Sequence, residues 1–196
     1  VFFFADSYFQ TKSYYLASYQ FESFVKSFPK SQKIEEASFL AAKSHYMMSP
    51  IYSLDQEETV TAIEKIQIFM NNYPNSEYTD ECNQLINELQ NKIEKKEFEV
   101  AKQYYTIYDY RAAINSMDNF IAEFVGSKFR EEALYYKFLS SYEIAINSIE
   151  SKKLQRLNDL KTLHNNIVRY YPETLFEEDL TKKMETVEKE INTFVN

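Results

Sequence analysis

Apolar side chains recur along this chain in steps of three, four and seven residues, a spacing that places them on one face of an α-helix. Four such ladders each end at a short polar segment. The ladders comprise Tyr14, Ala17, Phe24 and Phe28; Thr59, Ala62, Phe69 and Tyr73; Tyr110, Ala113, Phe120 and Phe124; and Leu157, Leu160, Ile167 and Tyr171. The pattern predicts four amphipathic helices that end at equivalent positions.

The polar segments, which we call the joints, share one pattern. They read FPKSQKIEEA from residue 28, YPNSEYTDEC from 73, FVGSKFREEA from 124 and YYPETLFEEDL from 170. Proline ends a helix because its ring clashes with the preceding turn and it has no N–H. The hydroxyl that follows is predicted to cap the next helix, and it belongs to Ser31, Ser76, Ser127 or Thr174.

Each joint then carries two consecutive acidic residues. They are Glu35–Glu36, Asp80–Glu81, Glu131–Glu132 and Glu178–Asp179. Consecutive side chains on a helix point in different directions, so these pairs are poorly suited to acid–base chemistry or to a metal. Carboxylates in a first turn stabilise the positive end of the helix dipole, and this is the role we predict for them.

A second phrase precedes three of the ladders, and it consists of alanine, two polar residues and two rings. It reads ADSYF at 5–9, AKSHY at 42–46 and AKQYY at 101–105. Alanine allows two helices to approach closely, so each phrase and ladder together predict a helix pair. The second pair contains an insertion around residues 47–58, which we interpret as a longer helix end and a loop, with Asp55 capping and Glu58 three residues later. The alternative is a rim that narrows a binding groove.

A period of about 45 to 50 residues with helix, turn, helix and a final proline is typical of a helical solenoid. The order of alanine, tyrosine, alanine, two aromatics and proline resembles the tetratricopeptide repeat. We therefore predict an all-α, right-handed superhelical solenoid of about five helix pairs in a single domain over 1–196. The ten helices expected are 2–11, 13–28, 33–47, 56–73, 77–94, 97–108, 110–124, 129–149, 154–171 and 175–194. Residues 77–108 could instead form one long helix.

Composition supports this fold class and excludes several functions. One Gly and four Pro in 196 residues leave little material for hairpins or phosphate-binding loops. The net charge of −8 has no basic stripe, which argues against nucleic acid. The lysine pairs at 95–96 and 152–153 are interpreted as solvated helix ends. No apolar run approaches the roughly 18 to 20 residues that a membrane helix needs.

Few residues could carry chemistry. His45 occupies the position of the packing rings Tyr8 and Tyr104, so we expect it to be half-buried. His164 is interpreted as an ordinary helix residue, and two histidines without an HExxH motif predict no metal site. Cys82 stands where two other joints have alanine, so it is predicted to be a small buried residue. The chain is predicted to have no catalytic residues and no cofactor, and not to be an enzyme.

Residues 73–114 carry a more specific resemblance, to the BamD (ComL-type) lipoproteins of the outer-membrane β-barrel assembly machinery. That family shows a Y-P-x-S-x-Y joint, a helix with leucines at every fourth position, an E-x-x-V-A-x-x-Y motif and a pair of small residues. The matching residues are Tyr73, Pro74, Ser76, Tyr78, Leu85, Leu89, Ile93, Glu97, Val100, Ala101, Tyr104, Ala112 and Ala113. The chain departs from the family at Ile107 and Ser116, where arginine is frequent.

The resemblance implies a scaffold lipoprotein at the periplasmic face of the outer membrane. Its lipidated cysteine would lie before Val1, and the lipid would be its only membrane contact. The resemblance also implies binding of the POTRA domains of the barrel-forming assembly protein, mainly through later repeats. Early repeats are implied to receive the extended C-terminal segments of unfolded outer-membrane proteins, which end in an aromatic residue.

In a tetratricopeptide array the first helix of each pair lines the concave groove. The residues predicted to face that groove are Asp6, Phe9, Gln10, Lys43, Tyr46, Met47, Lys102 and Tyr105. Their rings could receive apolar residues of an extended peptide, or they could simply pack against the adjoining repeat. For the whole chain, an alternative function is a general tetratricopeptide adaptor of another periplasmic or cell-envelope complex. A helical nutrient-binding lipoprotein is a weaker alternative, because such proteins carry large irregular insertions.

Overall fold

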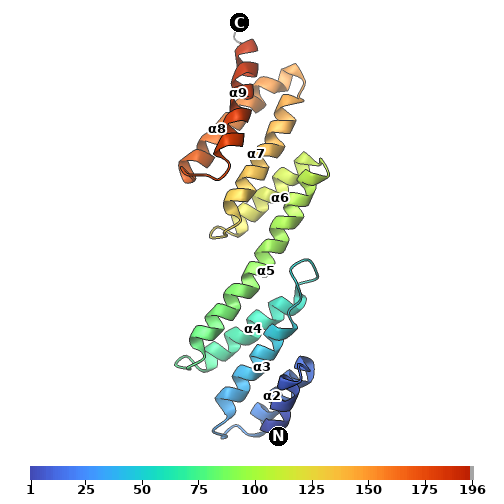
Figure 1. Ribbon diagram of the computed structural model, residues 1–196, viewed down its shortest axis with the longest axis vertical. Coiled ribbons are helices and arrows are strands. Elements are labelled where there is room, and N and C mark those ends of the chain that lie inside the picture. The colour runs from blue at the N-terminus through green and yellow to red at the C-terminus, as the bar shows by residue number, and fades with distance from the viewer. Residues whose placement is uncertain (195–196) are drawn as a thin grey trace. The chain divides into compact units, whose positions relative to one another are not determined.

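The computed structural model describes residues 1–194, and in that range it contains nine helices and no strand (Figure 1). The helices are α1 (Phe2–Gln10), α2 (Tyr14–Ser27), α3 (Ile34–Met48), α4 (Glu57–Asn72), α5 (Thr79–Thr106), α6 (Tyr110–Glu123), α7 (Arg130–Ile146), α8 (Glu150–Tyr170) and α9 (Glu177–Thr193). Successive helices pack side by side from α1 to α4 and from α6 to α9, and α5 shares apolar clusters with α4 and with α6. The all-α prediction is confirmed, and the packing is consistent with a tetratricopeptide-like array.

The predicted break between residues 94 and 97 does not exist, because α5 is continuous from Thr79 to Thr106. Neither proline nor glycine interrupts this stretch, and most of its residues are good helix formers. The described chain therefore contains four helix pairs followed by α9, in place of five pairs and ten helices. The alternative of one long helix over this region is correct.

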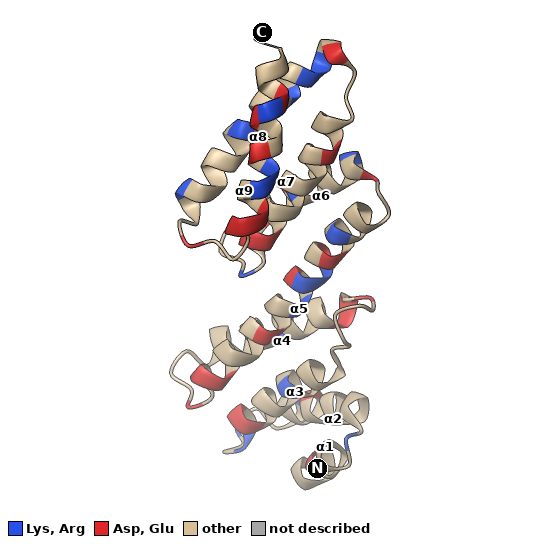
Figure 2. Cartoon of the chain, turned by 45° about the horizontal axis from the view of Figure 1, so that its top comes forward, with Lys and Arg blue, Asp and Glu red and all other residues tan. Residues whose placement is uncertain are grey.

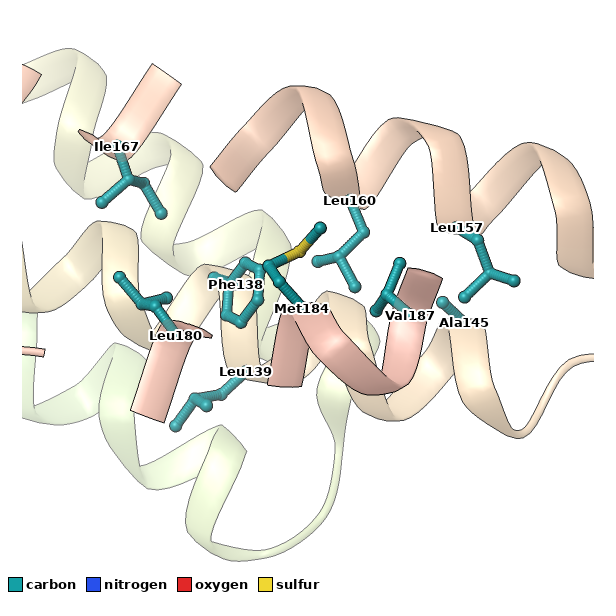
Figure 3. Packing of buried hydrophobic residues seen from close by; sticks show 9 residues of the cluster. All are labelled: Phe138, Leu139, Ala145, Leu157, Leu160, Ile167, Leu180, Met184 and Val187. Carbon is teal, nitrogen blue, oxygen red and sulfur yellow. The ribbon is translucent and has the colours of Figure 1, made fainter. Parts of the chain in front are cut away.

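Two compact units divide the chain within α5, Val1–Lys96 and Glu97–Asn196. In the first unit, one apolar cluster lies among α1, α2 and α3, and a second lies among α3, α4 and the first half of α5. In the second unit, one cluster lies among the second half of α5, α6 and α7. The other joins α7, α8 and α9 through Phe138, Leu160 and Met184 (Figure 3). Each first helix thus contributes to the core on both sides of it.

The predicted ladders supply these clusters. Ala17, Ala62 and Ala113 of the second helices are fully buried. The aromatic residues seven positions later, Phe24, Phe69 and Phe120, are buried against the preceding first helix. In α8 the larger side chains of Leu157, Leu160 and Ile167 occupy the same positions. The spacing rule therefore located the core of the second helices correctly.

The joints have nearly the same geometry in each repeat, but the hydroxyls do not cap the α-helices as predicted. The hydroxyl accepts a hydrogen bond from the N–H two residues later, which is Lys33 for Ser31, Tyr78 for Ser76, Phe129 for Ser127 and Phe176 for Thr174. The N–H at the first helical residue instead donates to the backbone carbonyl of that Ser or Thr. The joint is therefore a tight turn stabilised by the hydroxyl, and the helix begins one turn later.

An aromatic stack, which the spacing of residues along the chain does not predict, holds three of the four joints. The ring four residues after the Pro or Val position of the joint lies flat on a ring of the preceding first helix. The ring centroids are 4.1 Å apart for Tyr78 on Phe39, 5.4 Å for Phe129 on Phe98 and 4.0 Å for Phe176 on Tyr135. The interplanar angles are 6°, 10° and 7°. We call these three pairs the joint stacks.

In the first joint the equivalent position is a lysine. The ammonium of Lys33 lies 5.3 Å from the centroid of the Phe2 ring, so a cation–π contact replaces the stack. The partner on the preceding first helix is therefore aromatic in all four joints. Three residues after it the chain has alanine in α1, α3 and α5, as Ala5, Ala42 and Ala101.

Truncating a buried ring of a joint stack should destabilise the fold. Phe98 is 1% exposed and contacts Phe129, Phe120 and Tyr136. We expect Phe98→Ala to lower the free energy of unfolding by roughly 3 to 5 kcal/mol, because transfer and cavity costs add. The measurement is urea unfolding followed by circular dichroism. Phe3→Ala is the control, because this ring is 80% exposed, and equal losses for the two variants would contradict the proposed role of the stack.

Candidate protein-binding surface

Within each unit, two first helices are joined by polar contacts that include several of the predicted groove residues. The ammonium of Lys43 on α3 lies 2.6 Å from the Glu81 carboxylate on α5. One repeat later, Lys102 on α5 lies 2.9 Å from Glu132 on α7. In these two joints the second acidic residue, Glu81 or Glu132, has a role beyond the predicted stabilisation of the helix dipole. It forms an ion pair with a lysine of the preceding first helix.

The predicted groove rings lie next to these ion pairs. The hydroxyl of Tyr46 donates a hydrogen bond to the Glu88 carboxylate on α5. That bond, together with burial, raises the pKa of Tyr46 to about 12. In the second unit, Tyr105 packs edge-on against Tyr136 of α7, with ring centroids 5.2 Å apart. Both rings thus contact the adjoining repeat through part of their surface and remain half-buried.

The remaining predicted groove residues stay within their own helix pair or face solvent. On α1, the Gln10 amide donates to Asp6 at 3.3 Å, and the Phe9 ring packs on Tyr14 of α2 at 5.4 Å. Gln10 and Met47 are exposed. Lys43 and Tyr46 on α3 thus contact α5, and Lys102 and Tyr105 on α5 contact α7. Through the interactions described, Asp6, Phe9 and Gln10 contact only α1 and α2.

The insertion forms a loop, residues 49–56, that lies against α5. Lys92 donates to the Ser49 hydroxyl at 2.9 Å, and Lys96 donates to the Leu54 carbonyl at 2.9 Å. The ammonium of Lys95 lies 4.1 Å from the centroid of the Tyr52 ring. The prediction that residues 95–96 form a solvated helix end is therefore wrong, because both lysines lie within α5 and hold this loop.

The loop is also held from within, and its tip is apolar. The Gln56 amide, which is buried, donates to the carbonyls of Ile51 and Leu54. The Asp55 carboxylate accepts a hydrogen bond from the Glu57 N–H at 2.8 Å, but Gln56 occupies the N-cap position of α4, so Asp55 is not the predicted cap and stabilises the turn before the helix. The side chains of Ile51 and Leu54 are more than half exposed. The insertion thus presents two aliphatic side chains on a backbone fixed by hydrogen bonds.

Two grooves run over first helices between the flanking second helices. One, of about 190 Å³, lies over α3 between α2 and α4 and is lined by Val25, Ala41 and Ile68. The other, of about 330 Å³, lies over α7 between α6 and α8. A smaller groove of about 150 Å³ lies between α5 and α6, with the exposed carboxylates Glu97 and Glu123 at its edges.

The histidines have the environments predicted for them. His45 is half-buried, and its Nε2 lies 3.5 Å from the Glu22 carboxylate. Burial and the nearby Lys65 ammonium lower the pKa of His45, and Glu22 only partly offsets them. His164 is half-buried in α8 near the Phe138 ring. Within residues 1–194, no group of three or more histidine, cysteine or acidic side chains is placed to hold a metal ion.

Cys82 is fully buried, as predicted from the alanines at the equivalent positions of other joints. Burial, together with the neighbouring Glu81 charge, raises the pKa of its thiol to about 11. A thiol needs its thiolate form to act as a nucleophile. This cysteine therefore serves as a packing residue where the first turn of α5 meets α3 and α4.

The paired helices define a helical-repeat protein, a class in which stacked repeats create extended concave surfaces. The comparison with known families is specific. The chain belongs to the YfiO family of outer membrane lipoproteins, whose sequence profile matches residues 3–115 and again 93–193. Family membership confirms the resemblance seen in the sequence. Members of this family are not enzymes, in agreement with the prediction for this chain.

The chain is also similar to the outer membrane protein assembly factor BamD of Helicobacter pylori. The two share 36% identity over 67 residues, which is 34% of this chain and 30% of that protein. The aligned part thus covers less than a third of the relative's length. In addition, none of the helices described between residues 1 and 194 is both long and apolar enough to cross a membrane.

The Cys82 thiol should be unreactive in the folded protein. Because its pKa is about 11, the thiolate fraction at pH 8 is about a hundredfold lower than for an ordinary cysteine. We expect no reaction with Ellman's reagent over minutes at pH 8, and one thiol per chain in guanidinium chloride. Cys82→Ala is the control for the signal in denaturant. Rapid stoichiometric reaction of the native protein would show that this site is not buried.

Proposed function

We propose that this chain is a non-enzymatic scaffold of the outer-membrane β-barrel assembly machinery, located at the periplasmic face of the outer membrane. The observation that supports this most strongly is the YfiO family match, which covers helices of both units. The similarity to a protein named as an outer membrane protein assembly factor supports the same conclusion. The lipid attached upstream of this chain would tether it to the membrane.

The second unit is the proposed site for the POTRA domains of the barrel-forming subunit. Its helices present exposed carboxylates on a regular framework, such as Glu97 on α5 and Glu123 on α6. Charges at an interface rim accelerate association and select partners, although each adds little affinity. The net charge of the chain is −8, so we expect the bound domain to present basic side chains to this surface.

The first unit is the proposed site for extended segments of unfolded outer-membrane proteins. Phe9, Tyr46 and Met47 offer apolar surface on first helices, and Asp6, Gln10 and Lys43 offer polar groups beside them. The loop of residues 49–56 adds the exposed side chains of Ile51 and Leu54 next to the end of α3. A fixed apolar rim of this kind suits a segment with an aromatic end, because little of the receiving surface must become ordered on binding.

A calorimetric titration with the POTRA domains from the same organism tests the first part of the proposal. We expect saturable binding, and we expect Glu97→Lys/Glu123→Lys to weaken it about tenfold, because both carboxylates face the proposed partner. The matched control is Glu57→Lys/Glu64→Lys on α4 in the first unit, where both carboxylates are also exposed. Absence of binding at high micromolar concentration would contradict the scaffold function and favour a general adaptor.

A fluorescence titration with peptides tests the second part. The probe is a labelled peptide that copies the last residues of an outer-membrane β-barrel protein and ends in phenylalanine. We expect Met47→Ser/Ile51→Ser to weaken its binding about tenfold, because apolar contact area is lost from the exposed rim. Replacing the terminal phenylalanine of the peptide by serine should have a similar effect. If Met47→Ser/Ile51→Ser bound the peptide with unchanged affinity, Met47 and Ile51 would not belong to the peptide-binding site.

A further inference from the structure

The N-terminal hairpin, α1 and α2, exposes an unusual amount of aromatic surface. Phe3 is 80% exposed and Tyr15 is 76% exposed. Four further apolar residues of the same hairpin are exposed, namely Val1, Phe4, Leu16 and Tyr19. Tyr15 and Tyr19 lie one turn apart and therefore share one stripe of α2. These six residues, which we call the hairpin patch, lie outside the core formed by Phe2, Ala5, Ala17 and Phe21.

Soluble domains rarely expose so many large apolar side chains without a role in binding. Here α1 packs mainly on α2. A large exposed aromatic patch on a soluble domain indicates a site that binds a protein or a membrane.

The charges of this region favour an anionic partner, unlike those of the rest of the chain. Residues 1–33 contain four lysines and two acidic residues, whereas the remaining residues carry a net charge of −10. Both acidic side chains are engaged, Asp6 with Gln10 and Glu22 with Lys65 at 2.6 Å. Lys33 is also engaged, with Glu36 at 2.6 Å, so three lysines of residues 1–33 remain available to a partner. Few residues of the hairpin are coloured as charged in Figure 2.

The available cations lie on or beside the aromatic stripe. Lys12 is in the turn between α1 and α2, and Lys26 lies on the same stripe of α2 as Tyr15 and Tyr19. Lys30 follows in the first joint. All three are exposed, and none forms an ion pair with a described residue. Tyrosine and phenylalanine next to lysine is the composition of protein segments that lie at the membrane interface.

We propose that the hairpin patch binds directly to the surface of a phospholipid bilayer that contains anionic lipids. The aromatic rings enter the headgroup region, and Lys12, Lys26 and Lys30 contact lipid phosphates. This contact rests on the proposed function, because the family is one of outer membrane lipoproteins and the lipid would hold the hairpin near the bilayer. It differs from the expectation that the lipid is the only membrane contact.

Vesicle flotation of this chain, which carries no lipid, tests the proposal. The vesicles contain phosphatidylethanolamine with about a quarter phosphatidylglycerol, and we expect the chain to float with them. Tyr15→Ser/Tyr19→Ser should reduce the bound fraction at least about fivefold, because two interfacial rings are lost. Lys26→Glu/Lys30→Glu should reduce it on anionic vesicles and have less effect on vesicles of phosphatidylcholine alone.

The matched control is Tyr108→Ser/Tyr170→Ser, which removes two equally exposed tyrosines from the second unit. This variant should bind vesicles like the unmodified chain. Equal flotation of the two tyrosine variants, or no flotation of the unmodified chain, would overturn the proposal. Conversion of a dimer to a monomer by Tyr15→Ser/Tyr19→Ser, without vesicle binding, would assign the patch to a second copy of the chain instead.

The failure of this proposal can be separated from the failure of the proposed function. The vesicle experiment contains no POTRA domain, and the hairpin variants can be titrated with POTRA domains in solution. We expect Tyr15→Ser/Tyr19→Ser to bind POTRA domains with unchanged affinity. A loss in both experiments would overturn membrane docking as the role of the patch, since the patch would then belong to the protein interface.

Discussion

The contact on which the repeat geometry depends is the flat stack of one ring from a joint on one ring of the preceding first helix. Two planar groups about 4 to 5 Å apart fix both the distance and the rotation between the elements that carry them. The hydroxyl-stabilised turn of the joint sets where the next helix begins, and the stack holds that turn against the preceding first helix. The small residues that follow, such as Cys82 and Ala133, then allow that helix to approach closely.

Polar contacts extend the same arrangement on the first helices. On two first helices, a lysine follows the stacked ring by four residues. It forms an ion pair with a carboxylate that follows the ring of the joint by three residues. The two pairs are Lys43 with Glu81 and Lys102 with Glu132. These pairs are partly exposed, so each contributes little to stability. These pairs also orient the helices, since the lysine ammonium lies over the stacked ring of its own helix, 5.4 Å from the Phe39 centroid and 5.5 Å from the Phe98 centroid. The first hairpin differs, with Asp6 at the lysine position and Lys33 at the ring position.

The insertion and the N-terminal hairpin are the two places where the chain departs from its own repeat, and both expose apolar groups. The insertion would be a costly disordered segment if its backbone were free, but lysines of α5 and the Gln56 amide hold it. Rigid backbone with exposed aliphatic tips favours recognition, because little conformational entropy is lost on binding. The hairpin exposes aromatic residues on helices that are already packed, with the same consequence.

The sequence alone determined the fold class, the second-helix core and the family, because helical spacing and a recurring joint are local properties. Ala17, Ala62 and Cys82 could be assigned to buried positions by counting residues. Only the tertiary structure decided that α5 is continuous, since no local signal separates a helix end at Lys95–Lys96 from a helix interior. It also decided the joint stacks and the ion pairs of the first helices, which join residues about 30 to 45 positions apart. Such contacts depend on how two helices face each other, and spacing along one helix does not contain that information.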